Sequence, residues 1–497
     1  VSNSLTMSSF VIDTDTTAPS VSSSSPADSA TAGRTNTISV TFSEGMDNST
    51  ITTNTSNTAC SGTIQVSSDD FSSCVQMSSA PIASNSNKTF SVTPLSILST
   101  SSTYKIRVTT GVKDDSAYGH SLASQWTTSN GYTISWTIQS RDASNEYAWD
   151  IAIDNSSGNM YVAGRTDNGT DVDWDLFVAK YNSSGTKQWT NQLGSSPTNS
   201  LDWAFGVALD SSENVYVAGK TLGSLDGNSS SGNYDLFLVK YNSSGTKQWT
   251  RQLGSSNIDY VYDVTTDSSG NIFLAGGTTG SLDGNSSAGD EDIFLVKYNS
   301  SGTKQWTKQF GTNNTDYGSG VATDSSGNIY LMGTAGASID GGTYLGSGAL
   351  FVRKYNSAGT KQWTIMHGTS GHDYATTGWN GIAVDSSGNI FVSGITMGAY
   401  SGFSNAGGID IYVVKLNSSG TVQWTQQMDG SSDWEAANNL VIDSSSNIYV
   451  MGYAGSGFDG NTGQGSTDAM LVKYNSSGSK QWSRLYGSTA SDIGRGI

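Results

Sequence analysis

The residues of this chain that could bind a metal ion are carboxylates and amides in a loop that recurs. The loop LDGNSSSGNYD (225–235) has relatives at 282–292 and 458–468. Its side-chain oxygens are of the type that Ca²⁺ takes, but the glycine comes one place later than in an EF-hand loop and the terminal glutamate is missing. These features favour a solvated loop and no cofactor, with bound Ca²⁺ as the alternative. The candidate ligands are Asp226, Asn228, Asp235, Asp283, Asn285 and Asp292.

A second set of carboxylates precedes an aromatic or apolar residue at a regular interval. At such spacing the aspartates could form a ring of carboxylates at one mouth of a channel. The alternative is that each one caps the backbone of its own loop, which is the usual role of aspartate next to a turn. Turn chemistry favours the cap. The set is Asp202, Asp259, Asp316, Asp373, Asp433 and Asp492.

The sequence contains no recognisable catalytic constellation. Its three histidines, His120, His367 and His372, have no metal-ligand spacing, and we interpret them as surface residues. The G-x-S-x-G, H-E-x-x-H and Walker motifs are absent. The sequence therefore predicts a protein that is not an enzyme. A hydrolase or lyase would need carboxylates, tyrosine or arginine that converge at a channel.

The elements that must position these residues are set by a repeat. The decapeptide YNSSGTKQWT occurs unchanged at 181–190, 241–250 and 298–307, and near copies follow at 355–364, 416–425 and 474–483. One unit, 261–310, reads as four short strands: VYDVTTD, IFLAGGT, DIFLVKYN and KQWTKQFG. Four short strands per repeat are typical of a propeller blade.

The polarity of the strands supports this interpretation. IFLA and IFLV are apolar on both faces, as expected for middle strands covered by a neighbouring blade on each side. The fourth strand carries a lysine beside the tryptophan, and a charged edge resists pairing with another chain. Each tryptophan is expected to pack on the neighbouring blade. The repeated tryptophans are Trp189, Trp249, Trp306, Trp363, Trp424 and Trp482.

The D-S-S-G-N hairpin, the G-S-L-D-G loop (223–227, 280–284) and the Q-W strand resemble the bacterial seven-bladed β-propeller repeat family. The resemblance covers about 135–497 and implies a propeller on a bacterial surface or secreted protein, with no single known activity. Complete units from about 141 to 487 predict six blades. We expect TISWTIQS (133–140) and SDIGRGI (491–497) to be parts of a seventh.

The segment 17–133 has a different pattern, with short alternating strands such as TISVTFS (37–43) and TYKIRVTT (103–110) between turns. This predicts an antiparallel sandwich. ISVTFSEGMD (38–47) and YKIRVTTGVKDDSAYGHSL (104–122) resemble the bacterial Ig-like domains of surface-layer and adhesin proteins, although Gly-His replaces the usual Gly-Asn. The two cysteines, Cys60 and Cys74, have a spacing that fits a bridge in an oxidising compartment.

The sequence therefore predicts an all-β protein: a strand of a preceding Ig-like domain or linker (1–16), an Ig-like sandwich (17–133) and a propeller (134–497). A net charge of −18 without a basic cluster disfavours nucleic acid, and no apolar run is long enough for a membrane span. We expect a structural module at the bacterial cell surface, within a longer protein or fibre. The alternative is an adhesin that binds carbohydrate or protein through one propeller face, and unlike repeats focus attention on blades four and five, where Ala349 replaces an aspartate and TTGWNG is inserted.

A final expectation concerns self-association. Residues 1–13 read as an orphan strand and 491–497 as the start of a blade. Unpaired strand edges are templates for another chain. Head-to-tail strand donation between copies is therefore a hypothesis, beside association with neighbouring domains of the same protein.

Overall fold

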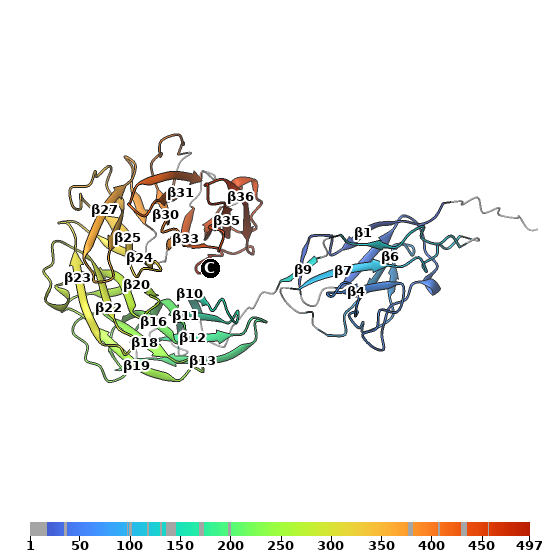
Figure 1. The fold of residues 1–497 in the computed structure, drawn as a ribbon, viewed down its shortest axis with the longest axis horizontal. Coiled ribbons are helices and arrows are strands. Elements are labelled where there is room, and N and C mark those ends of the chain that lie inside the picture. The colour runs from blue at the N-terminus through green and yellow to red at the C-terminus, as the bar shows by residue number, and fades with distance from the viewer. Residues whose placement is uncertain are drawn as a thin grey trace, which may run out of the picture. The chain divides into compact units, whose positions relative to one another are not determined.

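The computed structural model describes residues 17–33, 37–96, 98, 102–116, 119–129, 132–135, 146–167, 173–196, 200–375, 381–405, 408–428, 435–455 and 457–497. The chain divides into two compact units, Val1–Gln139 and Ser140–Ile497. In the described residues, regular structure consists of β-strands and three short 3-10 turns (Figure 1). Within these ranges no helix has the length and apolar character needed to cross a bilayer.

The first unit is a sandwich of two sheets, as predicted. One sheet has the order β1-β3-β6-β5 and the other β2-β9-β7-β4, with β8 beside β7. Alternate residues of β3 and β7 are buried, so Val40 and Ile106 meet Phe90 in one core. The elements are β1 (Val21–Ser25), β2 (Thr31–Gly33), β3 (Ile38–Phe42), η1 (Asn48–Thr50), β4 (Ile64–Ser67), β5 (Ile82–Ser84), β6 (Thr89–Val92), β7 (Thr103–Val108), β8 (Trp126–Thr127) and β9 (Tyr132–Ser135).

One predicted strand belongs to the other unit. Residues 133–140 were expected in the propeller, but β9 pairs antiparallel with β7 and parallel with β2. The assignment of 133–135 to the propeller, and the boundary between residues 133 and 134, are therefore wrong. The physical reason is that β9 satisfies its backbone groups between two sandwich strands. Residues 136–140, like 1–16, lie outside the described residues.

The second unit contains six four-stranded antiparallel sheets, each a meander of consecutive strands. These sheets are the six predicted blades. The middle strands are buried on both faces, for example throughout β21 and at six of the seven residues of β22. In Figure 1 the first strands of the blades, such as β20 and β24, lie toward the centre and the fourth strands, such as β19 and β23, form the rim.

Blade one comprises β10 (Glu146–Ile153), β11 (Met160–Asp167), β12 (Trp174–Tyr181) and β13 (Lys187–Leu193); blade two comprises β15 (Asp202–Leu209), β16 (Val215–Thr221), β18 (Asp235–Tyr241) and β19 (Lys247–Leu253). Blade three comprises β20 (Asp259–Thr266), β21 (Ile272–Thr278), β22 (Asp292–Tyr298) and β23 (Lys304–Phe310); blade four comprises β24 (Tyr317–Thr323), β25 (Ile329–Ala335), β26 (Ala349–Tyr355) and β27 (Lys361–His367).

Blade five comprises β28 (Asp373–Ala375) and β29 (Ile382–Val384) as a divided first strand, then β30 (Ile390–Thr396), β31 (Asp410–Leu416) and β32 (Val422–Met428). Blade six comprises β33 (Ala436–Ile442), β34 (Ile448–Ala454), β35 (Asp468–Tyr474) and β36 (Lys480–Tyr486). A small sheet joins β14 (Ser195–Ser196) to β17 (Ser224–Leu225), and η2 (Leu282–Gly284) and η3 (Phe458–Gly460) lie in loops.

The repeated decapeptide locks each blade to the next. Lys240 of blade two donates from Nζ to the carbonyl of Ser300 in the blade-three turn, at 3.1 Å. Trp249 lies under Gly302 of the same turn, where a Cβ would come within 2.9 Å of Trp249 Cε2. Gly302 has φ +76°, which glycine adopts without strain. Repetition of the ten residues thus reproduces one interblade contact around the ring.

The six tryptophans occupy equivalent positions on the fourth strands, since each is opposite the lysine of the third strand in the strand register. The register pairs are Lys180 with Trp189, Lys240 with Trp249, Lys297 with Trp306, Lys354 with Trp363, Lys415 with Trp424 and Lys473 with Trp482.

Residues 491–497 take the place of the first strand of a seventh blade. The amide of Gly494 bonds to the carbonyl of Gly452 in blade six at 3.1 Å. A Cβ at Gly496 would come within 2.8 Å of the Ile151 nitrogen in blade one, just as one at Gly206 would come within 3.2 Å of the Val264 nitrogen in the next blade. The segment therefore lies between blades six and one, which confirms the predicted partial seventh blade.

Candidate functional site

The aspartates that start the first strands cap their own loops. Asp259 is fully buried and accepts hydrogen bonds from the Ser255 amide (2.5 Å), the Ser255 hydroxyl (2.9 Å) and the Thr278 hydroxyl. Asp316 is bound in the same way by Thr312 and Gly336. Because these carboxylates face their own loops, they act as caps. Burial raises the pKa of Asp202 to about 6.

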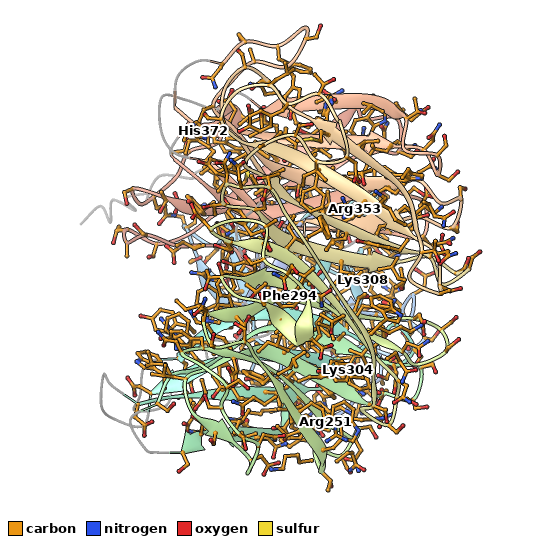
Figure 2. The ribbon with its side chains drawn as sticks, turned by 90° about the vertical axis from the view of Figure 1, so that its left-hand side faces the viewer. Arg251, Phe294, Lys304, Lys308, Arg353 and His372 are labelled. Carbon is orange, nitrogen blue, oxygen red and sulfur yellow. A yellow bond between two sulfur atoms is a disulfide. The ribbon has the colours of Figure 1, made fainter. Side chains whose placement is uncertain are left out.

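The residue after each capping aspartate is often aromatic, and these aromatic residues lie at one face of the propeller. Figure 2 shows the propeller from its edge and places His372, which directly precedes the first strand of blade five, at one face. The equivalent strand starts bring Tyr147, Trp203 and Tyr260 to this face, because they occupy the corresponding register positions in blades one to three.

Two cations lie among these aromatic rings. The Arg165 guanidinium carbon is 4.0 Å from the centroid of Trp203, 4.4 Å from Trp174 and 4.7 Å from Tyr147. Lys220 Nζ is 4.4 Å from the centroid of Trp203. It is also 4.5 Å from that of Tyr234. We call Tyr147, Trp174, Trp203, Tyr234, Tyr260, Arg165 and Lys220 the aromatic face.

Arg165 and Lys220 hold the same register position in blades one and two. Each lies opposite the aromatic residue of the first strand: Arg165 opposite Tyr147 and Lys220 opposite Trp203. The corresponding residues of blades three to six are Gly277, Thr334, Ile395 and Tyr453. The cations thus break the sixfold repetition at one part of the face.

Several polar groups of the aromatic face are without a partner among the described residues. Within those ranges, neither Arg165 nor Lys220 forms an ion pair with a carboxylate. The buried Arg165 Nε and the buried Trp203 Nε1 also have no hydrogen-bond partner there. A buried donor without a partner is costly, so this part of the face is held at some expense of stability.

Burial lowers the pKa of Lys220, and the neighbouring charge of Arg165 lowers it further. Burial also lowers the pKa of Arg165. The two cations therefore sit in a partly desolvated site, and among the described residues neither is paired with a carboxylate. A negatively charged group near both would relieve their repulsion.

Blade three borders the aromatic face with an acidic group. Glu291 accepts a hydrogen bond from the Tyr260 hydroxyl, and a side chain at Gly277 would collide with its carboxylate. Burial raises the pKa values of both Glu291 and Tyr260. Tyr262 follows in the same strand, and burial raises its pKa to about 12. These tyrosines hold their protons at neutral pH and can donate hydrogen bonds.

A second row of aromatic residues lies two positions further along the first strands, at β-bulges. Trp149, Phe205 and Tyr262 contact one another from blade to blade, with centroid distances of 5.1 and 6.1 Å. Arg495 lies over Trp149 at 4.0 Å. An open pocket of about 520 Å³ is lined by Tyr147–Ile151 and by residues of the 491–496 segment, and both Trp149 and Arg495 line it. Bulges re-aim side chains, and here they extend the aromatic row.

The side chains proposed for calcium take protein partners. Asp226 lies 2.6 Å from Lys247 Nζ and 2.8 Å from the Thr250 hydroxyl, whereas Asp235 accepts from the Ser231 amide and from Gln252. The amide of Asn228 donates to the Leu225 carbonyl. The second loop repeats these contacts: Asp283 pairs with Lys304, Asp292 accepts from Ala288 and Gln309, and Asn285 donates to Leu282.

Asp226 and Asp235 thus serve different partners, and the described residues contain no group of three or more His, Cys, Asp or Glu that could hold a metal ion. The lysines predicted to protect the outer edge, such as Lys247 and Lys304, also form an ion pair with the aspartate of the neighbouring loop. The same ion pair recurs as Lys361–Asp340 and Lys480–Asp459. Figure 2 shows Lys304 away from the face that carries His372.

The remaining predicted residues are distributed over both units. Cys60 and Cys74 form a disulfide in the sandwich. His372 stacks on Tyr374, and its Nδ1 is 3.0 Å from that hydroxyl. His367 lies on the outer strand β27, 3.0 Å from the Thr425 hydroxyl, and His120 is bound to Asp114. Asp433 and the inserted residues 376–380 lie outside the described residues.

The aromatic face was not predicted from the sequence. The unlike repeats lie in blades four and five, where Ala349 is buried at the start of β26, whereas the cations lie in blades one and two. A signal was present: Arg165 and Lys220 each follow the glycine of a Val-Ala-Gly sequence. Alignment of the blades on this glycine would have shown both cations at one position.

Comparison with known families agrees with the two units. The family described as Bacterial Ig-like domain matches residues 15–137. The family described as Beta-propeller repeat matches residues 188–226, 248–283 and 305–339.

Two curated proteins are similar to parts of the chain. The regulatory protein FlaEY of Caulobacter vibrioides is 25% identical over 367 residues, which are 65% of this chain and 37% of that protein. An uncharacterised WD repeat-containing protein of Acanthamoeba polyphaga mimivirus is 29% identical over 178 residues, 30% of this chain and 13% of that protein. The chain therefore spans well under half the length of each relative.

Solved structures with a similar course of the chain include an ulvan lyase bound to a saccharide, with 14% identity and a TM-score of 0.42 over 70% of this chain and 86% of that one. The propeller domain of the trilobed protease from Pyrococcus furiosus has 8% identity and a TM-score of 0.37 over 68% of this chain and 95% of that one. The family matches thus fall on the two units of the structure, with residues 15–137 similar to a Bacterial Ig-like domain and three segments of the propeller similar to the Beta-propeller repeat.

Proposed function

We propose that this protein is a non-enzymatic module of a bacterial extracellular or cell-surface protein, and that its propeller binds carbohydrate through the aromatic face. The observation that carries the proposal is the set of aromatic rings at blades one to three that gathers around Arg165 and Lys220. Sugar rings stack on aromatic side chains, and a few polar groups among such rings fix the orientation of the sugar.

The tyrosines of blade three are suited to contact a ligand as hydrogen-bond donors. Burial raises the pKa values of Tyr260 and Tyr262, so both hydroxyl groups keep their protons at neutral pH. The Ig-like domain and the low charge density fit the extracellular setting, where a single disulfide persists. The rest of the propeller then serves as the rigid support for this face.

The test is a glycan array probed with the purified protein and two variants. Trp203→Ala removes the ring shared by both cations and should abolish binding. Tyr374→Ala removes the ring at the same register position in blade five, where Ile395 replaces the cation, and should bind like the unaltered protein. Equal loss in both variants, or no binding of any glycan by the unaltered protein, would refute the proposed function.

A further inference from the structure

The aromatic face presents positive charge in a protein whose overall charge is strongly negative. The whole sequence has 24 Lys and Arg against 42 Asp and Glu, yet Arg165 and Lys220 both lie against the ring of Trp203, at 4.0 and 4.4 Å from its centroid. Charges that stay unpaired and partly desolvated are unfavourable unless a ligand compensates them. The two cations therefore indicate a ligand with negative charge.

The geometry also separates two kinds of contact. Trp203 contacts both cations, because its ring centroid is 4.0 Å from the Arg165 guanidinium carbon and 4.4 Å from Lys220 Nζ. Trp174 lies against Arg165, and Tyr234 lies against Lys220. A ligand that places a negative group against the cations would therefore have aromatic surface beside it.

On these grounds we infer that the ligand is an acidic polysaccharide, with a carboxylate or sulfate held by Lys220 and Arg165 and adjacent sugar rings held by Trp203, Trp174 and Tyr234. Planar guanidinium suits both anions, and the lysine adds a compact charge. This inference rests on the proposed function, because it assumes that the aromatic face binds carbohydrate. The Glu291 carboxyl group lies beside the face at blade three. We therefore place the negative groups of the ligand at blades one and two.

The experiment compares probes that share a sugar backbone and differ in charge. Oligogalacturonate is compared with its methyl ester, and a carrageenan oligosaccharide with its desulfated form, by isothermal titration calorimetry. We expect at least one acidic probe to bind tenfold or more tightly than its neutral counterpart, and its binding to weaken as salt increases. The carboxylate and sulfate arms identify which anion is preferred.

Two variants assign the effect to the site. Lys220→Gln should weaken the acidic probe about tenfold, the loss of one charge-assisted contact, and Lys220→Arg should retain most of the affinity. Lys308→Gln is the matched control, because Lys308 also lies over a tryptophan, 5.7 Å from the Trp306 centroid, but on the outer strand β23 (Figure 2). It should change affinity less than twofold.

Three outcomes would overturn the inference. Equal affinity for acidic and neutral probes would refute the acidic ligand while leaving carbohydrate binding intact. Equal effects of Lys220→Gln and Lys308→Gln would show that overall charge, not this site, determines the affinity. Failure of every probe to bind would refute the inference, whereas the proposed function would be refuted only if no glycan on the array bound.

Discussion

The interblade contact predicts that two glycines with the same backbone conformation differ in how well they tolerate a methyl group. Gly302 and Gly270 have φ angles of +76° and +74° in turns of the same blade, and both amides bond to a carbonyl at 2.9 Å. A Cβ at Gly302 would come within 2.9 Å of Trp249, which is closer than real Cβ contacts, whereas one at Gly270 would be 3.5 Å from Ser300.

Replacement by alanine therefore separates strain from packing. Both variants lose about 1 kcal/mol, because alanine disfavours the left-handed conformation. Gly302→Ala loses roughly 1–3 kcal/mol more, because the methyl group forces the tryptophan to shift. The free energy of unfolding is measured by urea titration with tryptophan fluorescence as the signal.

A double-mutant cycle tests the cause. In a Trp249→Ala background the extra cost of Gly302→Ala should disappear, leaving the cost seen for Gly270→Ala. Equal destabilisation by the two glycine substitutions in the natural background would contradict the interblade lock, as would an extra cost that persists without Trp249.

Other predictions follow from single contacts. Because burial raises the pKa of Asp202 to about 6, the contribution of Asp202 to stability is complete below about pH 4 and is lost as the pH rises through 6. The free energy of unfolding of Asp202→Asn, measured in urea, should therefore rise by up to ~3 kcal/mol relative to that of the natural protein between pH 4 and 7.5. A difference in unfolding free energy that stays constant over this range would disprove the prediction. Since Lys247 and Thr250 hold Asp226, EDTA should leave the melting temperature unchanged, and a drop of several degrees would instead establish the calcium alternative. Reductant should destabilise the sandwich by ~3 kcal/mol and spare the propeller in calorimetry, because Cys60 and Cys74 close a short loop; a shift of the propeller transition would be inconsistent with two independent units.

Local pattern was sufficient to predict the blades. Strands such as Ile272–Thr278 are apolar on both faces, and turns with glycine at positive φ separate them, so the sequence determines both where a strand ends and which faces are covered. The repetition of Trp and Lys then indicated which strand lies outside. Each of these signals is contained within one repeat.

The sheet that a given strand joins was harder to predict than the strand itself. Tyr132–Ser135 reads like a fourth strand, yet it pairs with Thr103 and Tyr104 in the sandwich, because alternation of side chains does not specify which sheet receives a strand. The aromatic face was hidden for a related reason. Arg165 meets Trp203 only after two blades are placed side by side, and the two residues are far apart in sequence.

If the aromatic face of blades one to three holds the ligand, hydroxyl-radical footprinting with and without oligogalacturonate will locate it there. We expect protection of Trp174, Trp203 and Tyr234, and unchanged labelling of Tyr374 at the corresponding position of blade five. Protection spread over the outer tryptophans such as Trp249 and Trp306, or protection of Tyr374 without Trp203, would contradict it.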